Sequence, residues 1–234
     1  MVIRPLLRFA APLVLLAALA ACGGEADVVD QDSSSKADTA KADGKPAKEQ
    51  GSIVESGFGQ GDDQYVWVTA LVENKSKKVG QTVTVSFNVK DEAGELLATT
   101  DQVESFSSTG QLLALGTQVD VGDGAKAASV EATLLVEDEG AFEGGPSLGT
   151  ADAEVSDSEF GGQEARFVVK NPTDKPLKDP RIGVICKDSA GKINGGTSEF
   201  PELVPPSGEI KVKTNFMTLS GEAKTCTAYI APGF

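Results

Sequence analysis

The 234-residue sequence predicts an all-β protein in which two tandem β-sandwich domains follow a disordered tether. Two observations predict strands: apolar and polar residues alternate with a period of two, and clusters of Gly, Asn, Asp, Ser and Pro separate the alternating runs. A third observation predicts two domains, because the pattern that starts near residue 52 recurs after 97 residues. No stretch beyond the first 21 residues has the period of an amphipathic helix.

The first 22 residues have the pattern of an export signal. Arg4 and Arg8 supply positive charge, and the apolar run that follows over 9–19 is too short to cross a bilayer comfortably as a helix. The tetrapeptide Leu19-Ala20-Ala21-Cys22 resembles the bacterial lipobox. That resemblance implies a signal peptide over 1–21, diacylglycerol attachment to the thiol of Cys22, and cleavage just before it. An ordinary signal peptide with a chance cysteine is the alternative interpretation.

Lipid attachment would place the protein in the cell membrane as a lipid-anchored protein on the extracytoplasmic face. Acyl chains anchor a protein firmly when two or three are present, since each buried CH₂ contributes about 0.8 kcal/mol. Gly23 rather than Asp follows the cysteine, and resemblance to the known sorting rule then implies the outer membrane in a bacterium with two membranes. Loss of Arg4 and Arg8 changes the formal charge from −14 to −16, so nucleic acid is not an expected partner.

Residues 22–51 comprise the lipidated cysteine and the predicted tether. The 28 residues from Gly23 to Gln50 contain no aromatic side chain, and their only large apolar residues are Val28 and Val29. Such a segment cannot bury enough surface to offset its ordering entropy, so we expect a disordered linker. As a flexible coil it has a root-mean-square reach of about 30 Å.

The repeat divides the remaining chain into a first domain over 52–145 and a second over 146–234. Each copy contains a Val-x-Asn motif, an alternating run that ends in Lys-Asp, and a Gly three residues after that Asp. The identities at one offset are Asn74 and Asn171, Asp91 and Asp188, and Gly94 and Gly191. Expected strands lie near 52–57, 64–73, 81–90, 95–106, 111–121 and 129–137, and then near 152–158, 163–170, 180–187, 192–199, 208–215 and 223–231. Six or seven short strands in about 90 residues are typical of an immunoglobulin-like sandwich.

A comparison of the two copies predicts which strand faces are buried. Along the second and third strands, every other position is apolar in both copies, and these positions are expected in the core. They are Val68, Ala70, Val72, Val85, Phe87 and Val89 in the first copy, and Ala165, Phe167, Val169, Ile182, Val184 and Cys186 in the second.

The third strand of each copy resembles the signature of the FxLYD-type domain, a small immunoglobulin-like module of bacterial extracytoplasmic proteins. The matching segments are Phe87-Asn88-Val89-Lys90-Asp91 and Val184-Ile185-Cys186-Lys187-Asp188, each with a preceding Val-x-Asn and a following Gly. Lys takes the place of the Tyr in both, and the second copy keeps only the alternation and the Asp. The resemblance extends from near residue 52 to the end, and it implies the sandwich fold and a non-catalytic module.

Cys186 and Cys226 are the two cysteines that remain once Cys22 carries lipid. In an oxidising compartment we expect them to form a disulfide, which would stabilise the second domain by about 4 kcal/mol in the chain-entropy model. Similar spacing in the two copies predicts that this bridge replaces a contact between Val89 and Leu134 of the first copy. Two free buried thiols are the alternative interpretation.

Tyr65 and Trp67 form a predicted interaction patch. They lie on a strand face that carries Gly162 and Glu164 in the second copy, so they are not expected in the core. Aromatic side chains are enriched at interfaces, and this pair therefore indicates a contact between the domains or with a partner. Packing beneath the local segment 57–59 is the alternative interpretation.

The composition excludes several kinds of catalytic site. The chain contains no His, which excludes Ser-His-Asp triads, Cys-His pairs and imidazole metal sites. The acidic clusters at 62–63, 91–95 and 137–139 lack EF-hand spacing and are interpreted as solvated turns. The segment 57–61 is rich in Gly but lacks the Lys and the helix of a phosphate-binding loop. No catalytic residue, metal or cofactor is predicted, and we expect the protein not to be an enzyme.

These features together predict a membrane-anchored extracytoplasmic lipoprotein. Its two domains would be presented to an envelope protein or to a cell-wall component, and the negative charge disfavours acidic wall polymers. The alternative is an accessory lipoprotein that binds a small molecule or an ion.

Overall fold

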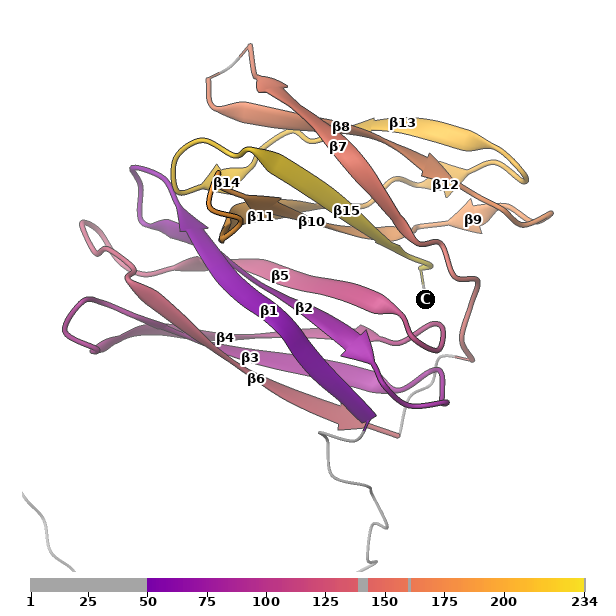
Figure 1. Ribbon diagram of the computed structural model, residues 1–234, viewed down its shortest axis with the longest axis horizontal. Helices are drawn as coiled ribbons and strands as arrows, with labels where there is room; N and C mark the ends of the chain where they lie inside the picture. The colour runs from indigo at the N-terminus through magenta and orange to yellow at the C-terminus, as the bar shows by residue number, and fades with distance from the viewer. Residues whose placement is uncertain (1–49, 139–142, 160, 234) are drawn as a thin grey trace, which may run out of the picture. The chain divides into compact units, whose positions relative to one another are not determined.

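The computed structural model describes residues 50–138, 143–159 and 161–233. These residues belong to one compact unit, 42–234, and their regular elements are β-strands in two groups that are consecutive in sequence (Figure 1). The predicted all-β fold is thus confirmed. The predicted signal peptide, Cys22 and the predicted tether before residue 50 lie outside the described residues.

The first strand group forms two three-stranded sheets. Its strands are β1 (Gly51–Gln60), β2 (Tyr65–Asn74), β3 (Thr82–Lys90), β4 (Leu96–Ser105), β5 (Leu112–Asp120) and β6 (Ser129–Glu137). One sheet has the order β1-β2-β5 and the other has the order β4-β3-β6. All pairings in both sheets are antiparallel.

The second strand group repeats this order and adds strands to it. Its strands are β7 (Thr150–Asp157), β8 (Gln163–Lys170), β9 (Leu177–Lys178), β10 (Arg181–Lys187), β11 (Ile193–Glu199), β12 (Leu203–Val204), β13 (Glu209–Lys213), β14 (Thr218–Leu219) and β15 (Thr225–Ala231). The run β7-β8-β13 corresponds to β1-β2-β5, and β11-β10-β15 corresponds to β4-β3-β6. Strand β7 belongs to both runs, because its first half pairs with β15 and its second half pairs with β8.

The twelve strands predicted from the sequence are present, with ends within three residues of the expected ones. Three further strands, β9, β12 and β14, were not predicted. Each of these is two residues long and is therefore too short to carry an alternating pattern.

Each strand group has its own apolar core, as expected for packed sheets. The core residues predicted from the two copies are confirmed, because each of them is at most 4 % exposed. In both groups these side chains alternate along the strand with less buried ones, for example along β3 and β8. The arrangement is consistent with a β-sandwich.

Asn74 and Asn171 are repeated because each organises a loop in the same way. Both residues are 2 % exposed, and each side-chain amide donates to backbone carbonyl groups of two separate segments. The acceptors are Lys78 O and Ser108 O at 2.9 Å in the first group, and Lys175 O at 2.7 Å, Pro205 O at 3.0 Å and Val204 O at 3.2 Å in the second. A buried amide that satisfies several backbone groups is costly to replace, so the repeat of Asn is structural.

The repeated Asp and Gly form the same turn in both groups. Asp91 Oδ1 accepts a hydrogen bond from the backbone N–H of Glu95 at 2.8 Å, and Asp188 Oδ1 accepts one from that of Lys192 at 3.0 Å. The glycines that follow, Gly94 and Gly191, have φ angles of +81° and +76°, a region that favours glycine. The acidic cluster 91–95 is therefore a hairpin turn, as interpreted from the sequence.

Cys186 and Cys226 form a disulfide, as predicted. They lie directly opposite each other on β10 and β15, with 4.1 Å between their Cα atoms. The predicted counterpart of this pair is wrong: Val89 lies opposite Val130, whereas Leu134 lies opposite Val85. The spacing is equal only when Gly208 is matched with Gly116. In the structure Gly208 corresponds to Gln111 instead, because the backbone N–H of Asn171 donates to Gly208 O as that of Asn74 donates to Gln111 O.

Candidate functional site

The two strand groups contact each other through the faces of their sheets. The sheet β1-β2-β5 lies against β10, β11, β14 and β15 (Figure 1). A small apolar cluster in this contact contains Leu71 from β2 together with Ile185 and Ile193 from the second group. Leu71 is 4 % exposed and Val72 is fully buried, so β2 is buried on both of its faces. This tertiary contact covers the strand face that the repeat marks as lying outside the core.

Glycines in the strands allow the sheets to approach closely. A Cβ atom on any of three strand glycines would overlap atoms of the facing group, which is the usual reason for Gly inside a strand. The nearest facing atoms are Ile193 Cβ at 2.5 Å for Gly57, Asn194 O for Gly59, and Ala114 Cβ at 2.7 Å for Gly183. The Gly-rich segment 57–61 is thus mainly a contact strand.

Polar groups also join the two strand groups. A hydrogen bond and ion pairs between described residues cross the contact. They join Gln60 N to Ser220 Oγ at 2.8 Å, Glu55 Oε1 to Lys187 Nζ at 2.7 Å, and Glu104 Oε1 to Arg181 Nη1 at 2.8 Å. The contact therefore combines apolar burial with directional interactions, which specify one arrangement of the two groups.

Trp67 lies in this contact. A Cβ atom added to Gly116 would be 2.8 Å from Trp67 Cζ2, and one added to Gly196 of the second group would be 3.1 Å from Trp67 Nε1. The indole nitrogen is buried and has no hydrogen-bond acceptor among the described residues. Tyr65 lies two residues away and is 41 % exposed. The segment 57–59 is part of β1, and Gly59 lies opposite Trp67 in the sheet, so it is not a loop that covers the aromatic pair.

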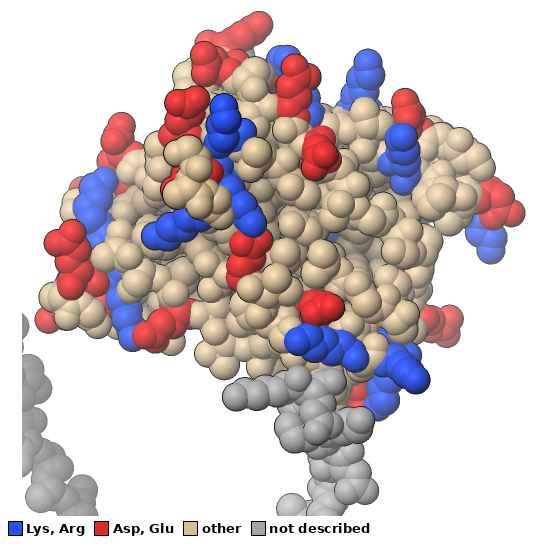
Figure 2. All heavy atoms as spheres, in the orientation of Figure 1, with Lys and Arg blue, Asp and Glu red and all other residues tan. Residues whose placement is uncertain are grey.

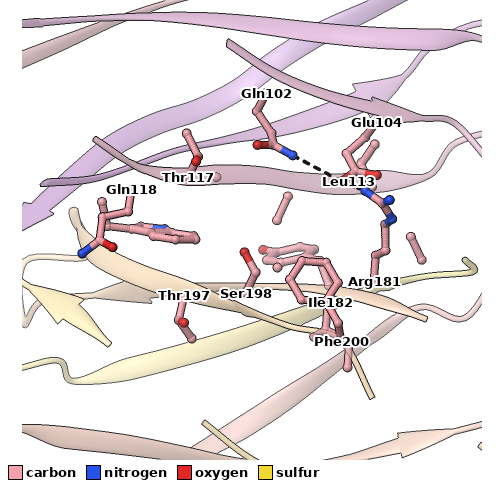
Figure 3. Close-up of a pocket in the computed structure, with 16 residues that line it drawn as sticks. Gln102, Glu104, Leu113, Thr117, Gln118, Arg181, Ile182, Thr197, Ser198 and Phe200 are labelled. Carbon is pink, nitrogen blue, oxygen red and sulfur yellow. Dashed lines mark hydrogen bonds and ion pairs between the residues drawn. The ribbon is translucent and has the colours of Figure 1, made fainter. Parts of the chain in front are cut away.

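A pocket of about 370 Å³ opens between the two strand groups (Figure 3). Strands β4 and β5 supply one side of it, and β10, β11 and β15 with the residue after β11 supply the other. In Figure 3, Gln102 and Glu104 face Ser198 and Phe200 across the pocket. The volume lies within the range that is usual for small-molecule sites, which occur preferentially at contacts of this kind.

Glu104 and Arg181 are the charged residues of the pocket lining. Glu104 lies opposite Val83 on the core-facing side of β4 and is 8 % exposed. Burial raises the pKa of its carboxyl above the ordinary value of 4.5, and the hydrogen bonds from Arg181 and Gln102 oppose this only in part. The carboxylate is therefore held at a desolvation cost that the partly exposed guanidinium only partly offsets.

We expect the burial of the Glu104 carboxyl to make stability depend on pH in a defined direction. Because the pKa of Glu104 is raised in the folded protein, its contribution is present below 4.5 and is lost as the pH rises through the folded pKa. The Glu104→Gln variant lacks this titration. The free energy of unfolding of the wild type, minus that of the variant, should therefore be larger at about pH 4 than at about pH 7. Urea denaturation of both proteins at both pH values measures this difference. If the difference is the same at pH 4 and pH 7, the pKa of Glu104 is not raised in the folded protein.

Tyr229 and Phe200 supply aromatic surface to the same pocket. Burial raises the pKa of the Tyr229 hydroxyl, and the charge of Glu55 adds to this, so the hydroxyl stays protonated at neutral pH. Phe200 is 63 % exposed. The pocket lining thus contains one largely exposed ring and one neutral phenol.

The other acidic clusters interpreted as turns have partners within the chain. Asp63 Oδ1 accepts a hydrogen bond from the backbone N–H of Tyr65 at 3.0 Å. Asp138 forms an ion pair with Lys78, and hydrogen bonds from Lys78 and then Gln81 lower the pKa of its carboxyl. Glu139 lies outside the described residues. Within the described residues, no three Cys, Asp or Glu side chains are grouped closely enough to hold a metal ion.

The pocket was not predicted from the sequence, although some of its residues carry a signal. On β4 the side chains of Gln102 and Glu104 point inward in the alternation, which is unusual for a strand that faces only an apolar core. Gly183 stands in the middle of an otherwise apolar strand, a sign of a close approach by another segment. Neither signal indicates which residues face each other across the pocket, because Glu104 and Arg181, for example, are 77 residues apart in the sequence.

Comparison with known proteins shows no relative: no family model matches the chain, and no curated protein matches it in sequence. Over the part of the chain that the structure describes, there is no helix that is both long and apolar enough to cross a bilayer. The features available for assigning a function are thus the sequence motifs, the contact between the strand groups and its pocket.

Proposed function

We propose that this protein is a lipid-anchored extracytoplasmic lipoprotein whose two immunoglobulin-like domains act as a non-catalytic binding module. The observation that carries the proposal is the tetrapeptide ending at Cys22, which resembles a lipobox and follows a charged and then an apolar segment. The polar segment 23–50 would hold the folded part away from the membrane as a tether.

The disulfide gives independent support for export. Cys186 and Cys226 are bonded, and disulfides persist in oxidising compartments outside the cytosol. This agrees with a signal peptide whether or not Cys22 carries lipid.

The matching sheet orders of the two strand groups support two immunoglobulin-like domains over 52–145 and 146–234. Their closely packed contact favours a pair that acts as one body, which would present its outer faces to a partner. Figure 2 shows acidic and basic side chains intermixed on the visible face. An envelope protein or an uncharged cell-wall component is therefore a better match than an acidic polymer.

A second candidate function is the binding of a small molecule. It is favoured by the pocket of about 370 Å³ between the strand groups, which brings together aromatic and polar residues from both. The two functions are compatible, because an anchored protein can hold a ligand between its domains.

The anchor is tested by metabolic labelling with an alkyne analogue of palmitate in a bacterial host. The wild-type chain should take up the label and fractionate with membranes, because the acyl chains would be attached at Cys22. The Cys22→Ala variant should lose both properties while it retains the disulfide, which serves as the control for export and folding. Wild-type protein that is exported and disulfide-bonded but unlabelled would show an ordinary signal peptide.

A further inference from the structure

We propose that the pocket between the two strand groups binds a neutral saccharide unit of one or two rings. This inference concerns the pocket alone and does not require the lipid anchor. Three properties of the lining carry it: its balance of charge, its unused hydrogen-bonding groups and its exposed aromatic ring.

The lining carries no net charge. Its charged residues are Glu104 and Arg181, and these form an ion pair with 2.8 Å between Oε1 and Nη1. A charged ligand would have to break this pair in a protein whose overall charge is strongly negative. An uncharged ligand can occupy the pocket and leave the pair intact.

The polar groups of the lining are available to a ligand. Thr117 and Gln118 lie on one side of the pocket, and Ser198 lies on the other (Figure 3). Thr197 also lines the pocket, but it lies opposite Val184 on the core-facing side of β11 and is 9 % exposed. None of the side chains of Thr117, Gln118 and Ser198 makes a hydrogen bond to another described residue. Hydroxyl and amide groups both donate and accept, and so do the hydroxyl groups of a sugar. Donors and acceptors on two sides of one space match a ring that carries hydroxyl groups around its edge.

The aromatic ring of Phe200 supplies an apolar surface at the same place. It is 63 % exposed, whereas most large apolar side chains of the second group are buried. The C–H faces of a sugar ring are apolar and pack on aromatic rings, while the hydroxyl groups project to the sides. An exposed ring next to unused hydroxyl and amide groups therefore suits a saccharide better than a purely apolar ligand.

The test uses the emission of Trp67, which lines the pocket and is the single Trp of the chain. Glucose, N-acetylglucosamine, maltose and chitobiose are titrated separately into the whole chain purified in detergent. At least one of them should give a saturable change in emission. The Phe200→Ala and Gln118→Ala variants should each weaken this binding, with about tenfold expected for loss of the ring.

Phe216→Ala is the matched control, because Phe216 is also an exposed ring, at 83 %, but does not line the pocket. It should leave the affinity unchanged. The proposal is overturned if no neutral saccharide gives a saturable change, if Phe216→Ala weakens binding as much as Phe200→Ala, or if glucuronic acid binds more tightly than glucose. The Cys22→Ala variant should bind as the wild type does, so failure of the anchor and failure of the pocket are separate results.

Discussion

Replacement of Cys186 and Cys226 by Val in one double variant should lower the free energy of unfolding by about 4 kcal/mol. The disulfide joins residues that are 40 apart in sequence, so it removes many conformations from the unfolded chain. Val is the appropriate substitute because the first strand group has Val89 opposite Val130 on the corresponding strands. The double variant thus keeps apolar packing and isolates the effect of the crosslink.

Guanidinium denaturation with and without reductant measures this effect. Reductant should bring the wild type to the stability of the double variant, and it should not alter the variant itself. If the oxidised wild type and the double variant unfold at the same denaturant concentration, the disulfide does not stabilise the fold as stated.

The Gly59→Ala variant should lose about 3 kcal/mol of stability, because the added methyl group has no space. Its Cβ would lie 2.6 Å from both Thr218 O and Gly195 Cα. These are backbone atoms of the facing group, which cannot move aside as a flexible side chain can. We expect the contact between the strand groups to open first, with faster hydrogen exchange in β11.

Gly61→Ala provides the control, because a Cβ at Gly61 would have no atom within 4 Å. One residue lies between the two sites, and the chemical change is the same. Thermal denaturation should place Gly61→Ala within about 0.5 kcal/mol of the wild type. Equal stability of the two variants would mean that the groups are not packed as closely as the glycines indicate.

Much of the fold could be predicted because its information is local. Alternation along a strand fixes which side chains share a face, and Phe87 and Val184 lie in the cores for that reason. The turn at Asp91 and Gly94 is also encoded locally, by a side-chain acceptor and a residue that tolerates positive φ. The repeat strengthened both predictions, since the same local signals occur twice.

The contact between the strand groups and its pocket depended on tertiary structure. Leu71 lies on a face that the repeat marks as external, yet it is 4 % exposed because the second group covers it. The sequence predicts Trp67 as a contact residue, but the residues around Trp67 in the sequence do not indicate that it packs against Gly196. The wrong pairing of Val89 with Leu134 has a different origin: it matches Gly208 with Gly116, whereas the backbone hydrogen bonds match Gly208 with Gln111, and a shifted match changes the register of the strand that follows.

The position of β15 imposes an order on assembly during synthesis. Strands β1 to β6 lie within residues 51–137, so the first strand group can complete its pairing before the second emerges. Strand β15, made last of the fifteen, lies between β7 and β10, and the second sheet cannot close without it. Cys186 therefore remains a free thiol until Cys226 has been added to the chain. The face of the first group around Leu71 remains exposed to solvent until the second group has folded. A nascent chain at this stage has a reactive sulfur and an open apolar face, the two groups that a folding helper in its compartment would need to protect.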